Sequence, residues 1–153
     1  MILAVDPGTT ETAWLVYDHG QPQPIVRFAK DTNADLLAYL HANDFTGCTH
    51  MAIEMIASYG MAVGKEVFDT CVWIGRYIEA WQAPYTLVYR RDVKLHLCHS
   101  ARANDSNIRA ALLDRFGPPG TKKAQRATYG LSGDAWSALA VAVTYAEMAG
   151  QQT

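Results

Sequence analysis

Three acidic residues stand where apolar segments of the chain end or begin. Asp6 follows the run ILAV, Glu54 ends the run MAIE, and Asp134 directly precedes AWSALAVAV. An acid beside a buried segment loses hydration that a partner must offset, and acids brought together raise one another's pKa unless a cation neutralises them. Oxygen ligands select hard cations such as Mg²⁺ or Mn²⁺. The pattern therefore indicates a metal site, although Asp6 alone, before Pro7 and Gly8, is also typical of a turn.

Such a site has a recognisable chemistry. A pair of divalent ions held a few ångströms apart by carboxylates activates water and stabilises the leaving oxygen in phosphodiester cleavage. This chemistry requires the three acids, which are far apart in the sequence, to meet in the fold. The elements between them must therefore bring their ends together.

The order of the predicted elements is that of an α/β fold. Short apolar or β-branched runs predict five strands, over Ile2–Val5, Thr12–Tyr17, Ile25–Ala29, His50–Glu54 and Thr86–Tyr89. The first three are joined by turns and form an antiparallel meander. A helical crossover then places the fourth strand parallel to the first and beside it, so that Asp6 and Glu54 emerge together at the carboxyl ends of neighbouring strands. We expect a five-stranded mixed sheet, with this meander plus two parallel strands, flanked by helices.

Apolar residues at helical spacing predict the helices that flank this sheet. They span Asn33–Asn43, Met61–Trp81, Val93–Cys98 (a short helix or connection) and Asp105–Phe116, and a nearly all-apolar last helix begins near Ser132–Asp134. Thr32 or Asn33 is expected to cap the first helix, and Asn104 or Asp105 the one before Phe116. The last helix is apolar on every side, so we expect it to be largely buried on the sheet.

The long helix predicted over Met61–Trp81 carries apolar residues beyond a single core face. Its core stripe follows steps of three and four residues through Val63, Val67, Cys71, Ile74, Ile78 and Trp81. Val72, Trp73 and Tyr77 lie off that stripe. We expect this helix to have a second partner, such as its symmetry mate in a dimer.

Charge is distributed unevenly along the chain, although the formal net charge is only −2. Residues 1–60 carry seven acids against Arg27 and Lys30, whereas residues 90–126 carry nine basic residues against three acids. A polyanionic partner is one interpretation of this basic stretch, and solvated helix faces with a basic loop are the other.

Length and cysteine usage predict one intracellular domain. A chain of 153 residues is long enough to bury a continuous core. Its three cysteines have no CxxC spacing, and no charged leader with an apolar stretch precedes the first predicted strand. We therefore expect a reducing cytoplasm, with no export signal and no membrane span.

Several motifs, taken together, resemble those of a known family. VDPGTTETAWLVYD, the acid-terminated MAIE run followed by a long helix, and GDAWSALAVAV resemble the RuvC family of Holliday-junction resolvases, within the ribonuclease H-like superfamily. VKLHLCHSARANDSNIRAALLDRFG combined with YGLSGDAWSALAVAV is most similar to its phage-encoded branch. The resemblance covers nearly the whole chain, and it implies a single RuvC-like nuclease domain over residues 1–153.

The resemblance also implies an activity and its requirements. A homodimer would bind four-way DNA junctions and make paired nicks with Mg²⁺ or Mn²⁺, two ions per active site, leaving 5′-phosphate and 3′-hydroxyl ends. No nucleotide cofactor would be needed. The location would be the cytoplasm of a bacterium or of a phage-infected host cell.

Individual residues carry the resemblance, with two departures. Asp6, Glu54 and Asp134 match the metal-binding carboxylates of the family, and Lys94 matches a lysine that we include among the catalytic candidates. Leu131 stands where a fourth acid or a histidine is common, and Asp105 stands where a lysine is common. Asp105 is therefore our candidate for the fourth metal ligand, with helix capping as the competing interpretation. Candidates for DNA contact are Tyr59, Arg90, Arg91, Lys94, Arg102, Lys122, Lys123 and Arg126.

Three other functions fit parts of the sequence. The segment DPGTT also resembles the phosphate loop of actin-like ATPases and sugar kinases, which close two such domains over a nucleotide, whereas 153 residues supply one. A ribonuclease H-like enzyme acting on structured RNA is the second. A junction-binding module without catalysis, its site degraded at Leu131, is the third. Retention of three acids argues against the last, because clustered negative charge repels phosphates.

Overall fold

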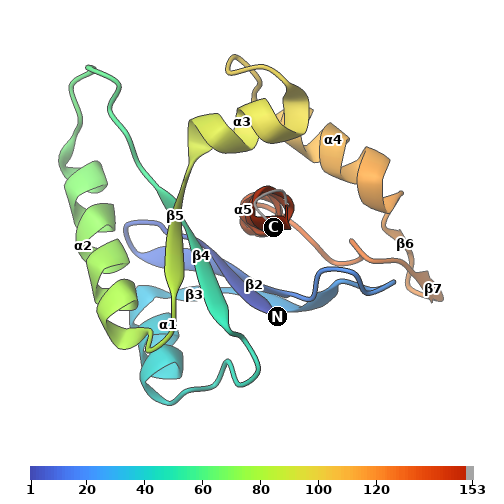
Figure 1. Ribbon diagram of the computed structural model, residues 1–153, viewed down its shortest axis with the longest axis horizontal. Helices are drawn as coiled ribbons and strands as arrows, with labels where there is room; N and C mark the ends of the chain where they lie inside the picture. Colours follow the sequence, from blue (N-terminus) through green and yellow to red (C-terminus); the bar gives the residue numbers. More distant parts are fainter. Residues whose placement is uncertain (151–153) are drawn as a thin grey trace.

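A five-stranded sheet organises the computed structural model, which describes residues 1–150 (Figure 1). Its strand order is β3-β2-β1-β4-β5, with bounds β1 Ile2–Asp6, β2 Glu11–Tyr17, β3 Ile25–Thr32, β4 His50–Met55 and β5 Tyr85–Tyr89. The first three strands pair antiparallel, and β4 pairs parallel with both β1 and β5. The predicted meander and the two parallel strands are confirmed.

The helices have the following bounds: α1 Asn33–His41, α2 Lys65–Ala80, α3 Arg90–Cys98, α4 Asp105–Phe116 and α5 Ala135–Gly150. The side chain of Thr32 caps α1, and Asn104 caps α4 through a reciprocal capping box with Asn107. Two short strands, β6 Gly120–Thr121 and β7 Ala124–Gln125, form a hairpin where the sequence predicted a loop. None of the helices within residues 1–150 has the length and apolar character to cross a membrane.

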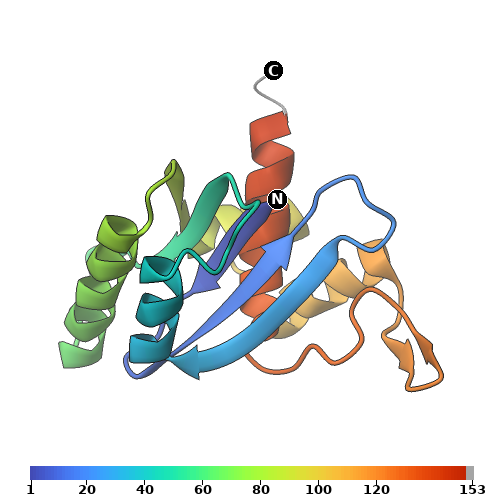
Figure 2. The ribbon, with the colours of Figure 1, turned by 90° about the horizontal axis from the view of Figure 1, so that it is seen from below.

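Two layers of helices cover the sheet (Figures 1 and 2). Helices α1 and α2 pack on one face, and α5 lies against the other, with α3 and α4 packed on α5. Alternation along the central strands produces two cores: Leu3 and Val5 of β1 face α1 and α2, whereas Ala4 faces α5. The expected burial of α5 is confirmed.

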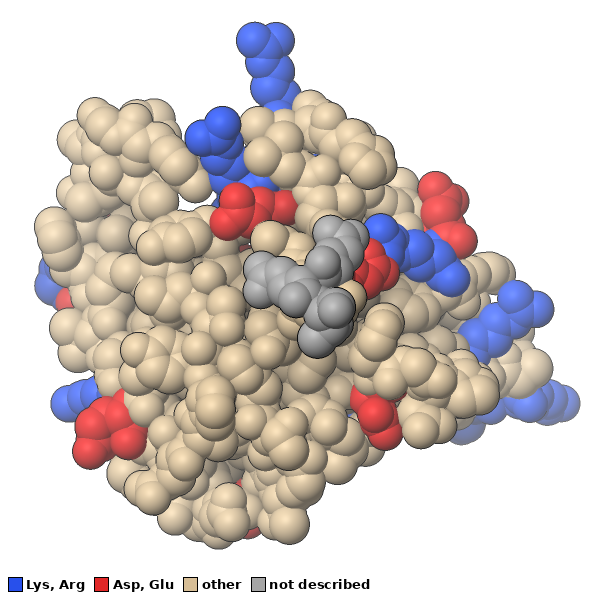
Figure 3. All heavy atoms as spheres, viewed as in Figure 1, with Lys and Arg blue, Asp and Glu red and all other residues tan. Residues whose placement is uncertain are grey.

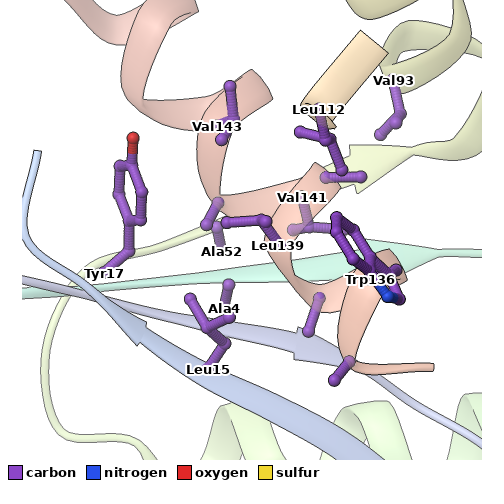
Figure 4. Close-up of a cluster of buried hydrophobic side chains, with 14 of the residues drawn as sticks. Ala4, Leu15, Tyr17, Ala52, Val93, Leu112, Trp136, Leu139, Val141 and Val143 are labelled. Carbon is purple, nitrogen blue, oxygen red and sulfur yellow. The ribbon is translucent and has the colours of Figure 1, made fainter. Parts of the chain in front are cut away.

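Small residues allow α5 to lie close to the sheet. Ala4 and Ala52 on the central strands meet a helix that contributes Ala138 and Ala142, all four without solvent exposure. Figure 4 shows the larger side chains of this core, including Trp136 of α5, arranged around the same helix. Close packing fixes the start of α5, and with it Asp134, relative to the end of β1.

Helix α2 packs on the core with part of the predicted stripe, namely Ile74, Ile78 and Trp81, but its buried face also includes residues that the sequence placed off that stripe. Tyr77, expected off the core stripe, has no solvent exposure, and Trp73 packs against the same core. The hydroxyl of Tyr77 lies 3.0 Å from that of Thr12 on β2, and the Thr12 hydroxyl donates a hydrogen bond of 2.7 Å to Asn33. This polar partner, distant in the sequence, draws Tyr77 inward. The exposed apolar residues of α2 are instead Phe68 and Val72, which are 62% and 59% exposed.

Candidate active site

Asp6 and Glu54 lie side by side at the carboxyl ends of two parallel strands. The register of β1 and β4 pairs Val5 with Ile53, so the next residue of each strand is one of the two acids. Both carboxylates are partly buried, and only 15% of the Glu54 side chain is exposed. The sheet topology itself therefore brings these two acids together, as predicted.

Asp134 reaches the same end of the sheet from the start of α5. Its charge is close enough to raise the pKa of Asp6. Lys30 of β3 forms an ion pair with Asp134 at 2.9 Å and a longer one with Glu11 at 3.4 Å. Lys30 is thus a cation of the site that sequence reasoning missed. Lys30 pairs with Ala13 of β2, the strand next to β1, and this register brings its side chain to the site.

Asp105 is the first residue of α4, and it does not cap that helix. Asn104 is the N-cap, because its side chain accepts a hydrogen bond from the backbone of Asn107. The Asp105 side chain is exposed and forms an ion pair with Arg90. Capping, the competing interpretation of this acid, is therefore wrong, and its carboxylate is directed to the site.

Arg90 bridges two of the carboxylates. It is the first residue of α3, immediately after β5, and its Nη1 lies 3.3 Å from Oε2 of Glu54 while its Nη2 contacts Oδ1 of Asp105. The sequence suggested this arginine only as a DNA contact. In the structure its guanidinium is engaged by the acids, with 26% of the side chain exposed.

The pKa of Asp6 is raised to about 8, chiefly by burial of its carboxyl group. Neighbouring charges on Glu54 and Asp134 raise it further, whereas Arg90 and a hydrogen bond with the Ser137 side chain lower it. Burial also raises the pKa of Glu54, and Arg90 and Lys94 work against that shift. In the absence of a further cation, neutral pH thus leaves a proton on Asp6.

The chemistry of the donor set fits a hard divalent cation, which prefers carboxylate oxygens. A cation beside Asp6 would also relieve the repulsion that raises its pKa. Within residues 1–150, however, no three Asp, Glu, His or Cys side chains converge closely enough to hold an ion. Arg90 and Lys30 instead occupy oxygens of Glu54, Asp105 and Asp134. Ion binding requires these side chains to be rearranged.

Leu131 supplies nothing to the site. Its side chain is buried in the core under α5, and its carbonyl accepts a hydrogen bond of 3.2 Å from the Trp136 indole. Next to the acids, a cavity of about 390 Å³ separates the first turns of α4 and α5. Arg90, Arg109, Ser106 and Ser137 line it together with Asp105 and Asp134.

The remaining candidates for DNA contact lie on α3 and on the connections that precede α2 and α4. Tyr59 is 59% exposed with a positive φ of 47°, in the connection between β4 and α2. Arg91 is exposed on α3, Arg102 is exposed before α4, and Lys94 is partly buried on α3. Each stands outside the carboxylate cluster, although the charge of Lys94 acts on Glu54.

The basic residues before α5 are carried by the β6–β7 hairpin. Lys122 and Lys123 form its turn, and Arg126 follows β7, with its backbone N–H bonded to the Pro119 carbonyl at 3.0 Å. Gly120 has φ of 81°, and a Cβ there would lie 2.2 Å from the Ala124 carbonyl oxygen, so only glycine allows this hairpin. Figure 3 shows Lys and Arg side chains gathered toward the end of the molecule at which the hairpin lies in Figure 1.

Comparison with known proteins confirms the fold. No family model and no curated protein sequence matches the chain. The solved structure of Thermus thermophilus RuvC matches with a TM-score of 0.73 and covers 99% of this chain and 96% of that one. A structure of T. thermophilus RuvC in complex with a Holliday junction substrate matches with a TM-score of 0.63, covering 97% and 95%. Sequence identity is 16% in both. The chain therefore has the ribonuclease H-like fold of RuvC.

The raised pKa of Asp6 predicts a pH dependence of stability. An acid whose pKa is 3.8 before folding and about 8 afterwards takes up a proton on folding between these values. The free energy of unfolding of the metal-free protein therefore contains a contribution that decreases as pH rises through this range. Asp6→Asn should remove it, so the melting temperature in EDTA should fall less between pH 5 and pH 8, an interval of about 3 units, than in the parent.

Asp114→Asn, which removes one exposed carboxylate from α4, is the matched control and should retain the pH slope of the parent. A parent slope retained by Asp6→Asn would mean that Asp6 stays ionised in the folded protein.

Proposed function

We propose that this chain is a structure-selective DNA endonuclease that resolves four-way or other branched junctions by paired, metal-dependent nicking. The proposal rests above all on one observation: three acids meet, because Asp6 and Glu54 lie at the carboxyl ends of adjacent parallel strands and Asp134 lies close enough to act on Asp6. The likeness to RuvC supports it, because the match spans nearly the whole chain and includes a structure in complex with a Holliday junction substrate.

Asp6, Glu54 and Asp134 would hold Mg²⁺ or Mn²⁺, with Asp105 as the fourth ligand, and the number of ions per site would be two. When bound, the metal would activate water and stabilise the leaving oxygen, so that the products carry 5′-phosphate and 3′-hydroxyl ends. Lys94 would offset negative charge on the attacked phosphate, from the position at which it already acts on Glu54.

DNA would be bound by exposed cations outside the carboxylate cluster. Lys122, Lys123 and Arg126 on the hairpin are suited to phosphate contact because all three are exposed. Arg91 and Arg102 would extend this contact along α3 and the turn after it. The exposed ring of Tyr59 would stack on an unpaired base near the branch point.

A homodimer would present two active sites to the two strands that are nicked. The exposed apolar side chains of Phe68 and Val72 on α2 are our candidates for its interface. Trp73 and Tyr77, which the sequence suggested for contact with a second partner, pack in the core of the single chain. We also propose a cytoplasmic enzyme of a bacterium or phage-infected cell, encoded by a phage, that needs no nucleotide cofactor.

Catalysis is tested by Asp6→Asn, Glu54→Gln and Asp134→Asn. Each should lower the cleavage rate on a four-way DNA junction by roughly 100-fold or more, because each removes a charged ligand of the metal. Binding should be unchanged or tighter, since less negative charge faces the phosphates. Nicking and gel-shift assays on one junction with Mg²⁺ or Mn²⁺ measure both quantities, and Asp114→Asn should behave as the parent.

A variant of these three that cleaves at close to the parent rate would show that its residue is not a ligand. The same assay on structured RNA separates the alternatives: faster cleavage of RNA would indicate a ribonuclease, and binding of the junction without cleavage by the parent would indicate a binding module.

The hairpin is tested through the salt dependence of junction binding. Replacing Lys122, Lys123 and Arg126 by Ala should weaken binding and flatten the plot of log K against log salt by up to about 0.9 for each phosphate that the hairpin no longer neutralises. As a matched pair, Lys122→Ala should reduce the slope, whereas Lys65→Ala, which removes an exposed lysine from α2, should not. An unchanged slope in the triple variant would mean that the hairpin faces away from DNA.

Assembly is tested by Phe68→Glu and Val72→Glu. A buried charge without a partner is costly, so each should convert a dimer to a folded monomer that is poor at paired nicking. Light scattering gives the mass, and circular dichroism reports folding. Val26→Glu is the control, since Val26 is a 53% exposed apolar residue on β3, and it should remain dimeric. Dimers in both α2 variants would put the interface elsewhere.

A further inference from the structure

Arg90 occupies an unusual place for a cation at a metal-binding site. Its two terminal nitrogens contact carboxylates of different elements, Glu54 on β4 and Asp105 on α4. An arginine side chain stays charged at every pH at which proteins fold, so this is a permanent positive charge among the acids. The charge of Arg90 also lowers the pKa of Asp6, so its effect extends to the third carboxylate.

The oxygen atoms that Arg90 contacts belong to the ligands that the proposed function assigns to metal. Oε2 of Glu54 and Oδ1 of Asp105 accept hydrogen bonds from the guanidinium. A cation bound between the same two side chains needs the lone pairs of these oxygens and the space that the guanidinium fills. Two cations that require the same oxygens oppose each other's binding.

We propose that Arg90 is an exchangeable counterion of the carboxylate site: it bridges Glu54 and Asp105 in the metal-free protein and releases them when a divalent cation binds. The inference rests on the metal-binding function proposed above. The released side chain has room to move, because Arg90 also lines the cavity of about 390 Å³ between the first turns of α4 and α5. Displacing the guanidinium thus requires no opening of the core.

The counterion has two consequences. Without metal, Arg90 offsets the repulsion between Glu54 and its acidic neighbours, so the metal-free protein tolerates a cluster of acids. With metal, release of Arg90 opposes binding, so the site binds an ion less tightly than its carboxylates alone would. Removal of the guanidinium should therefore lower the stability of the metal-free protein and raise its affinity for the ion.

Isothermal titration calorimetry with MgCl₂ and MnCl₂, in the absence of DNA, tests the proposal. Arg90→Gln should bind the ion about fivefold more tightly than the parent or better, which is the lower range of coupling between two sites. Its melting temperature in EDTA should be lower than that of the parent, and saturating Mg²⁺ should raise it by more.

Arg109→Gln is the matched control. Arg109 lines the same cavity, but its guanidinium lies 4.9 Å from the centre of the Trp136 ring, and the contacts described for it do not include a carboxylate. This variant removes the same charge from the same region and leaves the bridge intact. Its metal affinity should stay within about twofold of the parent, well below the coupling expected for Arg90.

The proposal is overturned if Arg90→Gln binds metal no more tightly than Arg109→Gln. A second variant, Arg90→Lys, is used if Arg90→Gln does not fold, because lysine keeps the charge but lacks the two terminal nitrogens that bridge the carboxylates. It should also bind metal more tightly than the parent. An unchanged affinity would contradict the exchange of Arg90 for metal. If the parent binds metal and cleaves a junction, and the Arg90 variants have the same metal affinity as the parent, the counterion role of Arg90 is wrong and the proposed function still stands. A parent that neither binds metal nor cleaves overturns both.

Discussion

Repulsion between carboxylates at one end of the sheet is the constraint on which the rest of the structure depends. Asp6 cannot move away from Glu54, because β1 is paired on one side with β2 and on the other with β4. Burial of the Asp6 carboxyl group raises its pKa to about 8, and repulsion from Glu54 and Asp134 contributes to that rise. The surrounding cations offset this repulsion: Arg90 bridges two acids and Lys30 pairs with a third. The carboxylates are thus held in place by basic side chains of the same chain.

The core on one face of the sheet determines how close the third acid comes. Alanines at Ala4 and Ala52 leave space that larger side chains would fill, and Ala138 and Ala142 of α5 use it. A bulkier residue at any of these positions would force the helix outward, since packed interiors do not absorb added volume without displacement. Asp134, which directly precedes α5, would move with it. The small side chains of this core therefore set how close Asp134 lies to Asp6, and with it the strength of the interaction between their charges.

Local patterns predicted the elements, and the topology rule predicted the meeting of Asp6 and Glu54. Short apolar or β-branched runs predicted the five strands, and capping chemistry predicted the starts of α1 and α4. What the sequence did not disclose were contacts between distant residues. Tyr77 falls off the predicted core stripe of its helix, and only its partner Thr12, 65 residues away, explains its burial. The bridge made by Arg90 depends likewise on a side-chain conformation that spacing cannot reveal.

The proposed activity requires acidic groups to bind metal and basic groups to bind the phosphates of DNA, and this short chain carries both. A site with four carboxylates repels the phosphates that it must approach, so attraction has to come from elsewhere on the molecule. Residues 126–134 link the basic hairpin directly to Asp134, and the buried side chains of Thr128 and Leu131 anchor this segment. Leu131 thus anchors the connection between the hairpin and Asp134 and supplies no side chain to the site. Burial of Leu131 favours a precise placement of the hairpin relative to Asp134 over a ligand from this segment. In the proposed function, Asp105, once released by Arg90, would supply the fourth ligand instead.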